Sequence, residues 1–168
     1  MNYFKYIPFD VVNGPGIRCT LFVSGCSIHC PDCFNKATWA YDAGYPFTDI
    51  EENHIIRDLQ DTKVNRKGFS ILGGEPLDPR NVEAVNKLLK NIRSNTTKDI
   101  WLWTGYEYEN VPLTEHIFYI LEHVDVIVDG PFIAKKKDLT LPYRGSSNQR
   151  IIDAKQSTFC NIVELDVE

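Results

Sequence analysis

The sequence has 168 residues, of which 43% are hydrophobic, and carries a formal net charge of −5. This length suits one hydrophobic core and is short for two ordinary domains, so we expect a single domain over residues 1–168. The acidic balance argues against a nucleic-acid-binding protein, because neutralising phosphates requires a surplus of Lys and Arg on one face. The N-terminal segment lacks the apolar stretch of a signal peptide or membrane helix, which predicts a cytoplasmic protein.

The first predicted elements are a strand over 17–23 and a helix that ends near Asp61. The strand runs directly into the first cysteine of a cysteine-rich loop. Thr48 and Glu51 have the spacing of a capping box, which marks the start of the helix. The apolar positions expected on the buried face of this helix are Ile50, Ile55, Ile56 and Leu59.

A short strand over 69–72 and the clearest helix of the sequence come next. The turn between them is glycine-rich at 73–76, and Asp78 is placed to cap a helix that has Pro79 in its first turn. The apolar stripe of this helix is Val82, Val85, Leu88, Leu89 and Ile92.

The second half of the chain continues the alternation. Strands are predicted over 100–104 and 124–129, separated by a weaker helix with apolar positions at Ile117, Ile120 and Leu121. A loop over 141–149 precedes a final apolar segment. Alternating strands and helices favour an α/β fold with a mainly parallel sheet and crossover helices, in which ligands bind beyond the carboxyl ends of the strands. Both the cysteine loop and the glycine turn fall at that edge.

Three of the five cysteines, Cys26, Cys30 and Cys33, lie within one short loop. An odd number of cysteines without an export signal argues against a disulfide framework. The spacing lets one tight loop present three thiolates to a common point, and soft thiolates select zinc or iron–sulfur clusters. A four-iron cluster normally has four cysteine ligands, so this loop leaves one iron without a protein ligand unless Cys19 or Cys160 supplies it.

Spacing alone leaves two other interpretations open. The first is a structural zinc site in which His29 is the fourth ligand, although no second pair of Cys or His follows. The second is a thioredoxin-like dithiol at Cys30-Pro-Asp-Cys33, in which Cys26 would have no role.

Several segments resemble one known family, the radical-activating branch of the radical S-adenosylmethionine enzymes. The later segments look particularly like the small activating proteins of anaerobic ribonucleoside-triphosphate reductases. The matching segments are GPGIR (14–18), GCSIHCPDCFNKATW (25–39), GGEPL (73–77), WTGY (103–106), VDGPF (128–132) and RGSSNQR (144–150).

The resemblance implies a partial (β/α) barrel of the radical S-adenosylmethionine type and an oxidoreductase activity. Cys26, Cys30 and Cys33 would bind a [4Fe–4S] cluster, and S-adenosylmethionine would chelate the fourth iron and be cleaved to a 5′-deoxyadenosyl radical. That radical would take a hydrogen atom from a glycine of the partner, the large subunit of anaerobic ribonucleoside-triphosphate reductase. A strong reductant such as flavodoxin is also implied, because cleaving a sulfonium needs a cluster potential at the low end of the known range.

The resemblance also implies which residues contact S-adenosylmethionine. Gly73, Gly74 and Glu75 match the segment that receives the methionine amino group, and glycines at a strand end do let a ligand approach the backbone. Many family members place an aromatic residue before the last cysteine, to pack on the adenine, but here that position is Asp32. We therefore expect Phe34, or the backbone around Cys33, to make this contact.

Two functional alternatives remain beside an activase of the reductase. The same radical chemistry can act on another glycyl-radical enzyme or on a small molecule, and the cysteine loop can belong to a non-catalytic zinc-binding adaptor. The short chain favours a macromolecular substrate, because fewer strands than in longer relatives would leave the site more open on one side.

Overall fold

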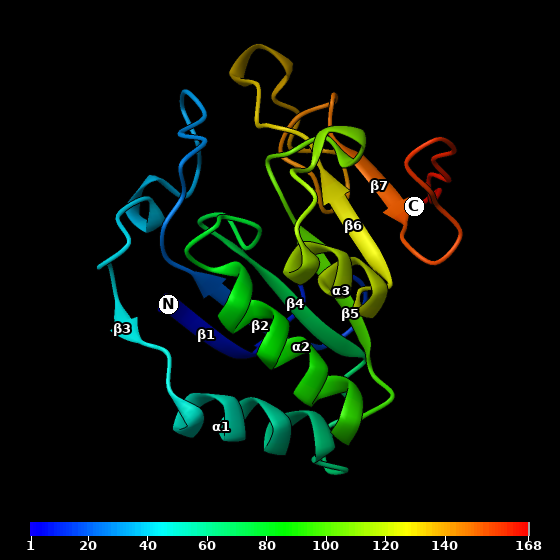
Figure 1. The fold of residues 1–168 in the computed structure, drawn as a ribbon. Helices are drawn as coiled ribbons and strands as arrows, with labels where there is room; N and C mark the ends of the chain where they lie inside the picture. The colour runs from blue at the N-terminus through cyan, green and yellow to red at the C-terminus, as the bar shows by residue number, and fades with distance from the viewer. Residues whose placement is uncertain (168) are drawn as a thin grey trace.

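The computed structural model describes residues 1–167 and has a mixed α/β architecture built on one seven-stranded sheet (Figure 1). The strands are β1 (Asn2–Asp10), β2 (Arg18–Val23), β3 (Tyr45–Pro46), β4 (Gly68–Gly73), β5 (Asp99–Trp103), β6 (Val126–Asp129) and β7 (Arg150–Asp153). The helices are α1 (Asp49–Gln60), α2 (Val82–Asn95) and α3 (Glu115–His123), with short 3₁₀ turns η1 (Lys36–Thr38), η2 (Tyr108–Asn110) and η3 (Ala134–Lys136). None of these helices is long and apolar enough to cross a membrane.

The centre of the sheet is parallel and its edges are antiparallel. The strand order is β3-β1-β2-β4-β5-β6-β7, in which the pairs from β2 to β6 are parallel. Helices α1, α2 and α3 each connect one parallel strand to the next, which confirms the predicted α/β sheet with crossover helices. At the edges, β1 and β7 run antiparallel to their neighbours. The sheet is open: within residues 1–167, the edge strands β3 and β7 do not pair with each other.

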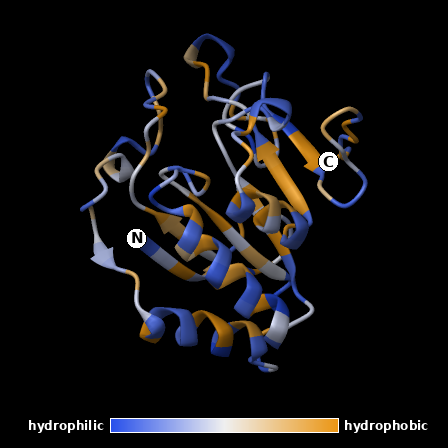
Figure 2. Ribbon diagram, in the orientation of Figure 1, coloured by the Kyte–Doolittle hydropathy of each residue, from blue (hydrophilic) through white to orange (hydrophobic). Residues whose placement is uncertain are grey.

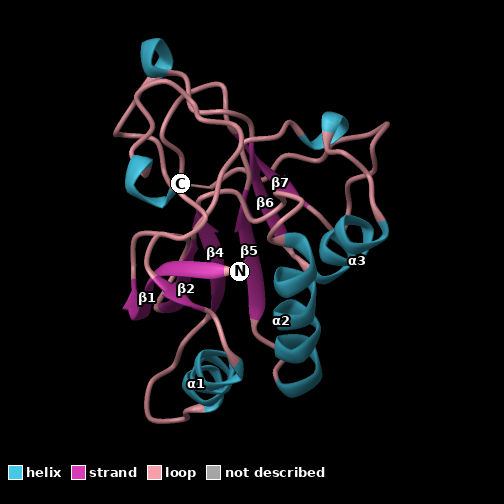
Figure 3. Ribbon diagram, turned by 60° about the vertical axis from the view of Figure 1, so that its left-hand side comes forward, coloured by secondary structure: helices cyan, strands magenta, loops and turns pink. Residues whose placement is uncertain are grey.

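Parallel strands bring the loops that follow them to one edge of the sheet. In Figure 3 the long loops gather beyond the carboxyl ends of β4, β5 and β6, whereas α1 lies toward the opposite end. The cysteine loop follows β2 and the glycine turn follows β4, as expected from the sequence. This edge therefore holds the segments that carry the predicted chemistry.

The main core lies between the sheet and the helices. In Figure 2 the helices show apolar stripes on otherwise hydrophilic surfaces, and β6 and β7 are strongly apolar. Every apolar position predicted for α2 and α3 is buried, which confirms both stripes. On β2 and β4, side chains that include Cys19, Leu21, Phe69 and Ile71 contribute to the same core.

Helix α1 confirms the capping box but corrects its predicted apolar face. The Glu51 carboxylate accepts a hydrogen bond from the backbone N–H of Thr48 at 2.9 Å, and the Thr48 hydroxyl accepts one from the N–H of Ile50 at 3.2 Å. Ile50, however, is 65% exposed, while Glu52 is buried. At about 100° per residue, Ile50 lies roughly opposite the stripe of Ile55 and Leu59, whereas Glu52 lies on it.

Two other expectations need correction. Helix α2 begins at Val82, with Asn81 and not Asp78 at its N-cap position, and the Asp78 carboxylate accepts the N–H of Arg80 in the turn that precedes the helix. Strands β1 and β3 were not predicted at all. Pro8 interrupts the strand pattern of β1 and lies where the β1–β2 register shifts, a position that tolerates a missing N–H.

Arg150 fastens the edge strand β7 to the rest of the fold. Its guanidinium pairs with Asp129, which is almost fully buried, and with Glu109 in η2, whose carboxylate lies at 2.6 Å. Asp129 also accepts the backbone N–H of Tyr108. A carboxylate at the carboxyl end of a parallel strand is well placed to contact a ligand. The oxygens of Asp129, however, are bonded to Arg150 and Tyr108 inside the protein.

We predict that Ile55→Ala lowers the free energy of unfolding by about 2–5 kcal/mol, because it leaves a cavity in the core. The matched control is Ile50→Ala on the same helix, which should change that free energy by less than about 0.5 kcal/mol, because Ile50 faces solvent. Urea denaturation followed by circular dichroism measures both variants. Equal losses would contradict the orientation of α1.

The ion pair of Glu109 predicts a pH dependence of stability. Hydrogen bonding from Arg150 lowers the pKa of Glu109 from 4.5 to about 2, so its contribution is present above pH 4.5 and is lost as the pH falls toward 2. The melting temperature of Glu109→Gln should therefore lie below that of the wild type at pH 7, and the gap should narrow below pH 4.5. The gap should be modest and should shrink with salt, because Glu109 is partly exposed. Glu164→Gln, at an exposed glutamate, serves as the control, and a gap that is constant with pH would refute the prediction.

Candidate metal centre and its cavity

The cysteine loop leaves β2 through Ser24 and Gly25 and folds back on itself. The N–H groups of Gly25 and Cys26 donate to the carbonyls of Thr38 and Trp39 at 2.8 and 3.1 Å, which closes the loop at its base. Within it, His29 and Asp32 both have positive φ, at 51° and 59°. These left-handed residues turn the chain tightly around the cysteines.

All three thiols of the loop are free and face one cavity. Cys26 is buried, and Cys30 and Cys33 are partly buried. Burial raises the pKa of the Cys26 thiol, although the backbone N–H groups of His29 and Ile28 lower it. The N–H of Asn35 donates to the sulfur of Cys33 at 3.3 Å. Hydrogen bonds of this kind to cysteine sulfur tune the potentials of iron–sulfur clusters, so the donor set and its surroundings suit such a cluster.

The glycine turn after β4 packs directly on the backbone at the base of the cysteine loop. The N–H of Gly74 donates to the carbonyl of Val23, and that of Glu75 to the carbonyl of Gly25, both at 2.8 Å. A Cβ atom at Gly74 would lie 2.4 Å from the Gly25 oxygen, a distance that no side chain tolerates. Glycine is therefore required here for contact between the two segments.

Glu75 is buried beneath the cavity and bonded within the protein. Its carboxylate accepts hydrogen bonds from the N–H of Leu77, the hydroxyl of Thr104 and the N–H of Gly105, at 2.9, 2.9 and 2.8 Å. Burial raises the pKa of Glu75 to about 7, while these bonds lower it and so oppose the effect of burial. Glu75 thus ties the glycine turn to the end of β5, and one of its oxygens, Oε2, accepts a single bond.

A cavity of about 560 Å³ lies between the cysteine loop, the glycine turn and the loop after β6. Its volume is within the range of pockets for small organic ligands. Of the residues predicted to bind the cluster or S-adenosylmethionine, the cavity is lined by Cys26, Cys30, Cys33, Phe34, Gly73, Gly74 and Glu75. Asp32 is not among the lining residues: its side chain is 75% exposed and lies 3.7 Å from the ammonium of Lys36.

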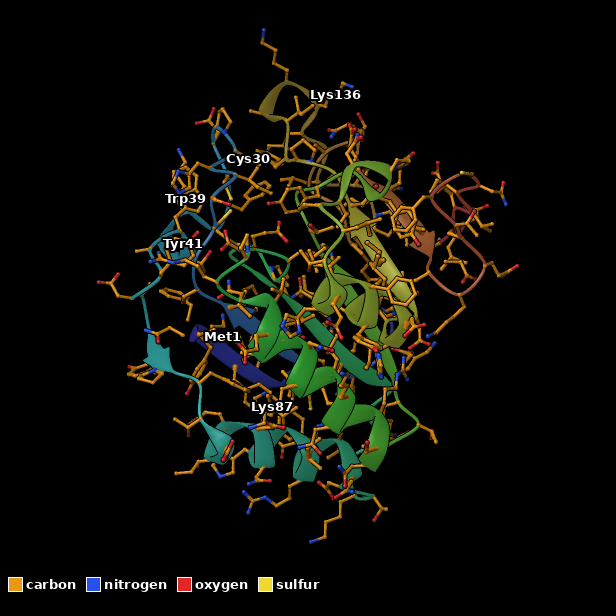
Figure 4. The ribbon with its side chains drawn as sticks, viewed as in Figure 1. Met1, Cys30, Trp39, Tyr41, Lys87 and Lys136 are labelled. Carbon is orange, nitrogen blue, oxygen red and sulfur yellow. The ribbon has the colours of Figure 1, made fainter. Side chains whose placement is uncertain are left out.

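Aromatic side chains form the outer wall of the cavity. Phe34 packs on Phe132 with ring centroids 4.8 Å apart, and the ammonium of Lys137 lies 4.9 Å from the Phe34 ring. Figure 4 shows Cys30 and Trp39 on one side of the upper edge and Lys136 on the other. The cysteine loop and the lysine-bearing loop therefore meet at this aromatic wall.

The other candidate ligands lie elsewhere. The imidazole of His29 stacks on the Trp39 ring at 4.5 Å and does not line the cavity, and neither Cys19 nor Cys160 does. In residues 1–167, no group of three Cys, His, Asp or Glu side chains is close enough to hold a single metal ion. The arrangement of three thiols around a cavity, with His29 turned to Trp39, is unlike the zinc site considered from the spacing.

Sequence reasoning missed Asn81, which holds the site together, and several residues that line the cavity, among them Arg144. The Asn81 side chain, fully buried, donates to the carbonyls of Ser24 and Glu75, both at 3.0 Å, and so bridges the cysteine loop and the glycine turn. Arg144 lines the cavity from the loop before β7. Asn81 offers no signal in the sequence, whereas Arg144 belongs to the matching segment 144–150.

Comparison with known proteins agrees with this geometry. A family model described as a 4Fe-4S single cluster domain matches residues 12–152. The anaerobic ribonucleoside-triphosphate reductase-activating protein of Escherichia coli (strain K12) is 49% identical over 150 residues, covering 89% of this chain and 96% of the relative. The proteins of the same name from Vibrio cholerae serotype O1 and Enterobacteria phage T4 are 47% and 39% identical over 152 residues, covering 90% of this chain and 97% and 93% of the relatives. The chain therefore belongs to the family of anaerobic ribonucleoside-triphosphate reductase-activating proteins that carry a 4Fe-4S single cluster domain.

Proposed function

We propose that this chain is a radical S-adenosylmethionine activase that installs a glycyl radical on anaerobic ribonucleoside-triphosphate reductase. The observation that carries the proposal is the set of three free thiols, Cys26, Cys30 and Cys33, that face one cavity beside the Gly73–Gly74 turn. The relatives' shared name supports the choice of partner. We assign the open sheet to the partial (β/α) barrel of this enzyme class, with the cavity at the carboxyl ends of its parallel strands.

The three cysteines would hold a [4Fe–4S] cluster. When bound and reduced, such a cluster would supply the electron for cleavage of the sulfonium of S-adenosylmethionine, the chemistry that would generate the glycyl radical on the reductase. The chain contributes orientation and shielding. Backbone N–H groups that bond to the cysteine sulfurs stabilise the thiolate form, and they would adjust the reduction potential of a cluster bound to these sulfurs.

The remaining lining residues would orient S-adenosylmethionine. Gly73 and Gly74 leave backbone exposed to the cavity, and the free lone pairs of Glu75 Oε2 suit an ammonium. Phe34, with Phe132 behind it, offers an aromatic face for the adenine. Asp32 points away from the cavity, so any contact from this position would involve the backbone.

The mouth of the cavity suits a protein substrate. A glycine inside a folded enzyme reaches the cavity only if the mouth admits a loop of polypeptide, and Phe34 at this mouth is 56% exposed. Exposed apolar side chains around a pocket are typical of surfaces that bind another protein. We propose a reductant such as flavodoxin as the electron donor.

Anaerobic reconstitution with iron and sulfide tests the proposed function. Reduction in the presence of S-adenosylmethionine and the reductase should release 5′-deoxyadenosine and produce an organic radical signal in electron paramagnetic resonance. Absence of that signal with a competent reductase would overturn the activase proposal. Cleavage coupled to a small-molecule product without any protein partner, or a colourless protein with one tightly bound zinc, would decide for the alternatives.

We predict that Cys26→Ala, Cys30→Ala and Cys33→Ala each abolish cluster assembly, because each removes one of the thiolates that line the cavity. Cys19→Ala and Cys160→Ala are the matched controls and should assemble the cluster normally, since neither side chain lines the cavity. Iron content and visible absorption after anaerobic reconstitution measure the outcome. Loss of the cluster in either control would contradict the ligand assignment.

A further inference from the structure

Among residues 1–167, Arg144 differs from the other buried or partly buried arginines in having no carboxylate partner. The four that pair with Asp or Glu are Arg18, Arg66, Arg93 and Arg150. Arg144 lines the cavity, and the polar contact of its guanidinium within the described chain is a bond from Nη1 to the carbonyl of Gln149 at 3.2 Å. Its Nε has no hydrogen-bond partner within residues 1–167. The guanidinium thus lines the cavity with donors that no acceptor of the described chain uses, and such a group suits an anion.

The loop that carries Arg144 is fixed in place before any ligand binds. Tyr143 has a positive φ of 57°, and its carbonyl accepts a hydrogen bond from the indole of Trp103 at 2.9 Å. The Gln149 side chain accepts the N–H of Gly145 at 2.9 Å and donates to the carbonyl of Gly130 at 3.0 Å. Anchors on both sides therefore hold the backbone of Arg144 in position, which lowers the entropic cost of binding a ligand there.

The composition of the cavity wall narrows the choice of anion. Among its described lining residues, Glu75 is the one carboxylate and Arg144 the one guanidinium or ammonium group. A polyphosphate would require several donors or cations, whereas the surroundings of Arg144 include Phe132, Leu141 and Tyr143. One acidic and one basic group match the ammonium and carboxylate of a free amino acid end.

We infer that Arg144 binds the carboxylate of the methionine portion of S-adenosylmethionine. The assignment rests on the proposed function and deepens it, because it names the group that recognises one end of the ligand. Guanidinium presents parallel donors to a carboxylate, and such charge-assisted bonds are strong and specific in geometry. Arg144 is a binding residue in this assignment, and it discriminates against adenosyl ligands that lack the carboxylate.

The test uses two uncleavable probes, S-adenosylhomocysteine and its decarboxylated analogue, with the anaerobically reconstituted holoprotein. Equilibrium dialysis should show that the wild type prefers S-adenosylhomocysteine. Arg144→Met should weaken binding of S-adenosylhomocysteine about tenfold to hundredfold and binding of the analogue less than about twofold. Arg144→Lys should retain part of the preference, because it keeps the charge but lacks the paired donors.

Arg57→Met removes an equal charge from the exposed face of α1 and should bind both probes as the wild type does. Unchanged iron content in Arg144→Met would show that its effect does not arise from loss of the cluster. Should that variant fail to assemble, the comparison of probes in the wild type and in Arg144→Lys still decides. Equal binding of the two probes to the wild type, or an equal loss of both in either variant, would overturn the assignment of Arg144 alone. Failure of the wild-type holoprotein to bind S-adenosylhomocysteine would instead overturn the proposed function as well.

Discussion

The close backbone contact between the glycine turn and the base of the cysteine loop is the constraint on which the site depends. Parallel pairing of β2 with β4 brings Val23 beside Gly73, and the hydrogen bonds from Gly74 and Glu75 continue this pairing past the ends of both strands. The contact is possible because no Cβ intervenes. It sets the position of the thiols relative to the exposed backbone that a ligand would meet, and Asn81 then locks both segments to the start of α2.

The buried guanidinium of Arg18 also stabilises the site, through a chain of hydrogen bonds that reaches the cavity wall. Arg18 is fully buried, pairs with Asp99, and donates from Nε to the Ser70 hydroxyl at 2.7 Å. Ser70 in turn donates to the carbonyl of Asn13 at 2.6 Å, and Asn13 lines the cavity. Desolvating a guanidinium is expensive, and these partners offset the cost. The arginine of the GPGIR segment therefore acts as internal scaffold that holds one wall of the cavity, and Gly14 lies against its side chain.

The sequence predicted most of what depends on local pattern. The spacing of Cys26, Cys30 and Cys33 identified the loop, and the 3.6-residue periodicity identified the buried stripes of α2 and α3. Ile50 shows the limit of such reasoning, because an apolar residue in the first turn of a helix need not lie on the buried stripe. What escaped prediction depends on contacts between distant segments. Strand β1 acquires its role only by pairing with β2, and the bridging amide of Asn81 acquires its role only once β2 and β4 lie side by side.

The distribution of tryptophan gives the protein a built-in optical probe of one region. The chain has three tryptophans, of which Trp39 and Trp103 line the cavity and Trp101 packs 5.8 Å from Trp103. Intrinsic fluorescence would therefore report on the surroundings of the thiols and far less on α1 or α2. A chromophore in the cavity would quench that emission by energy transfer, so its arrival and loss can be followed in real time without a label.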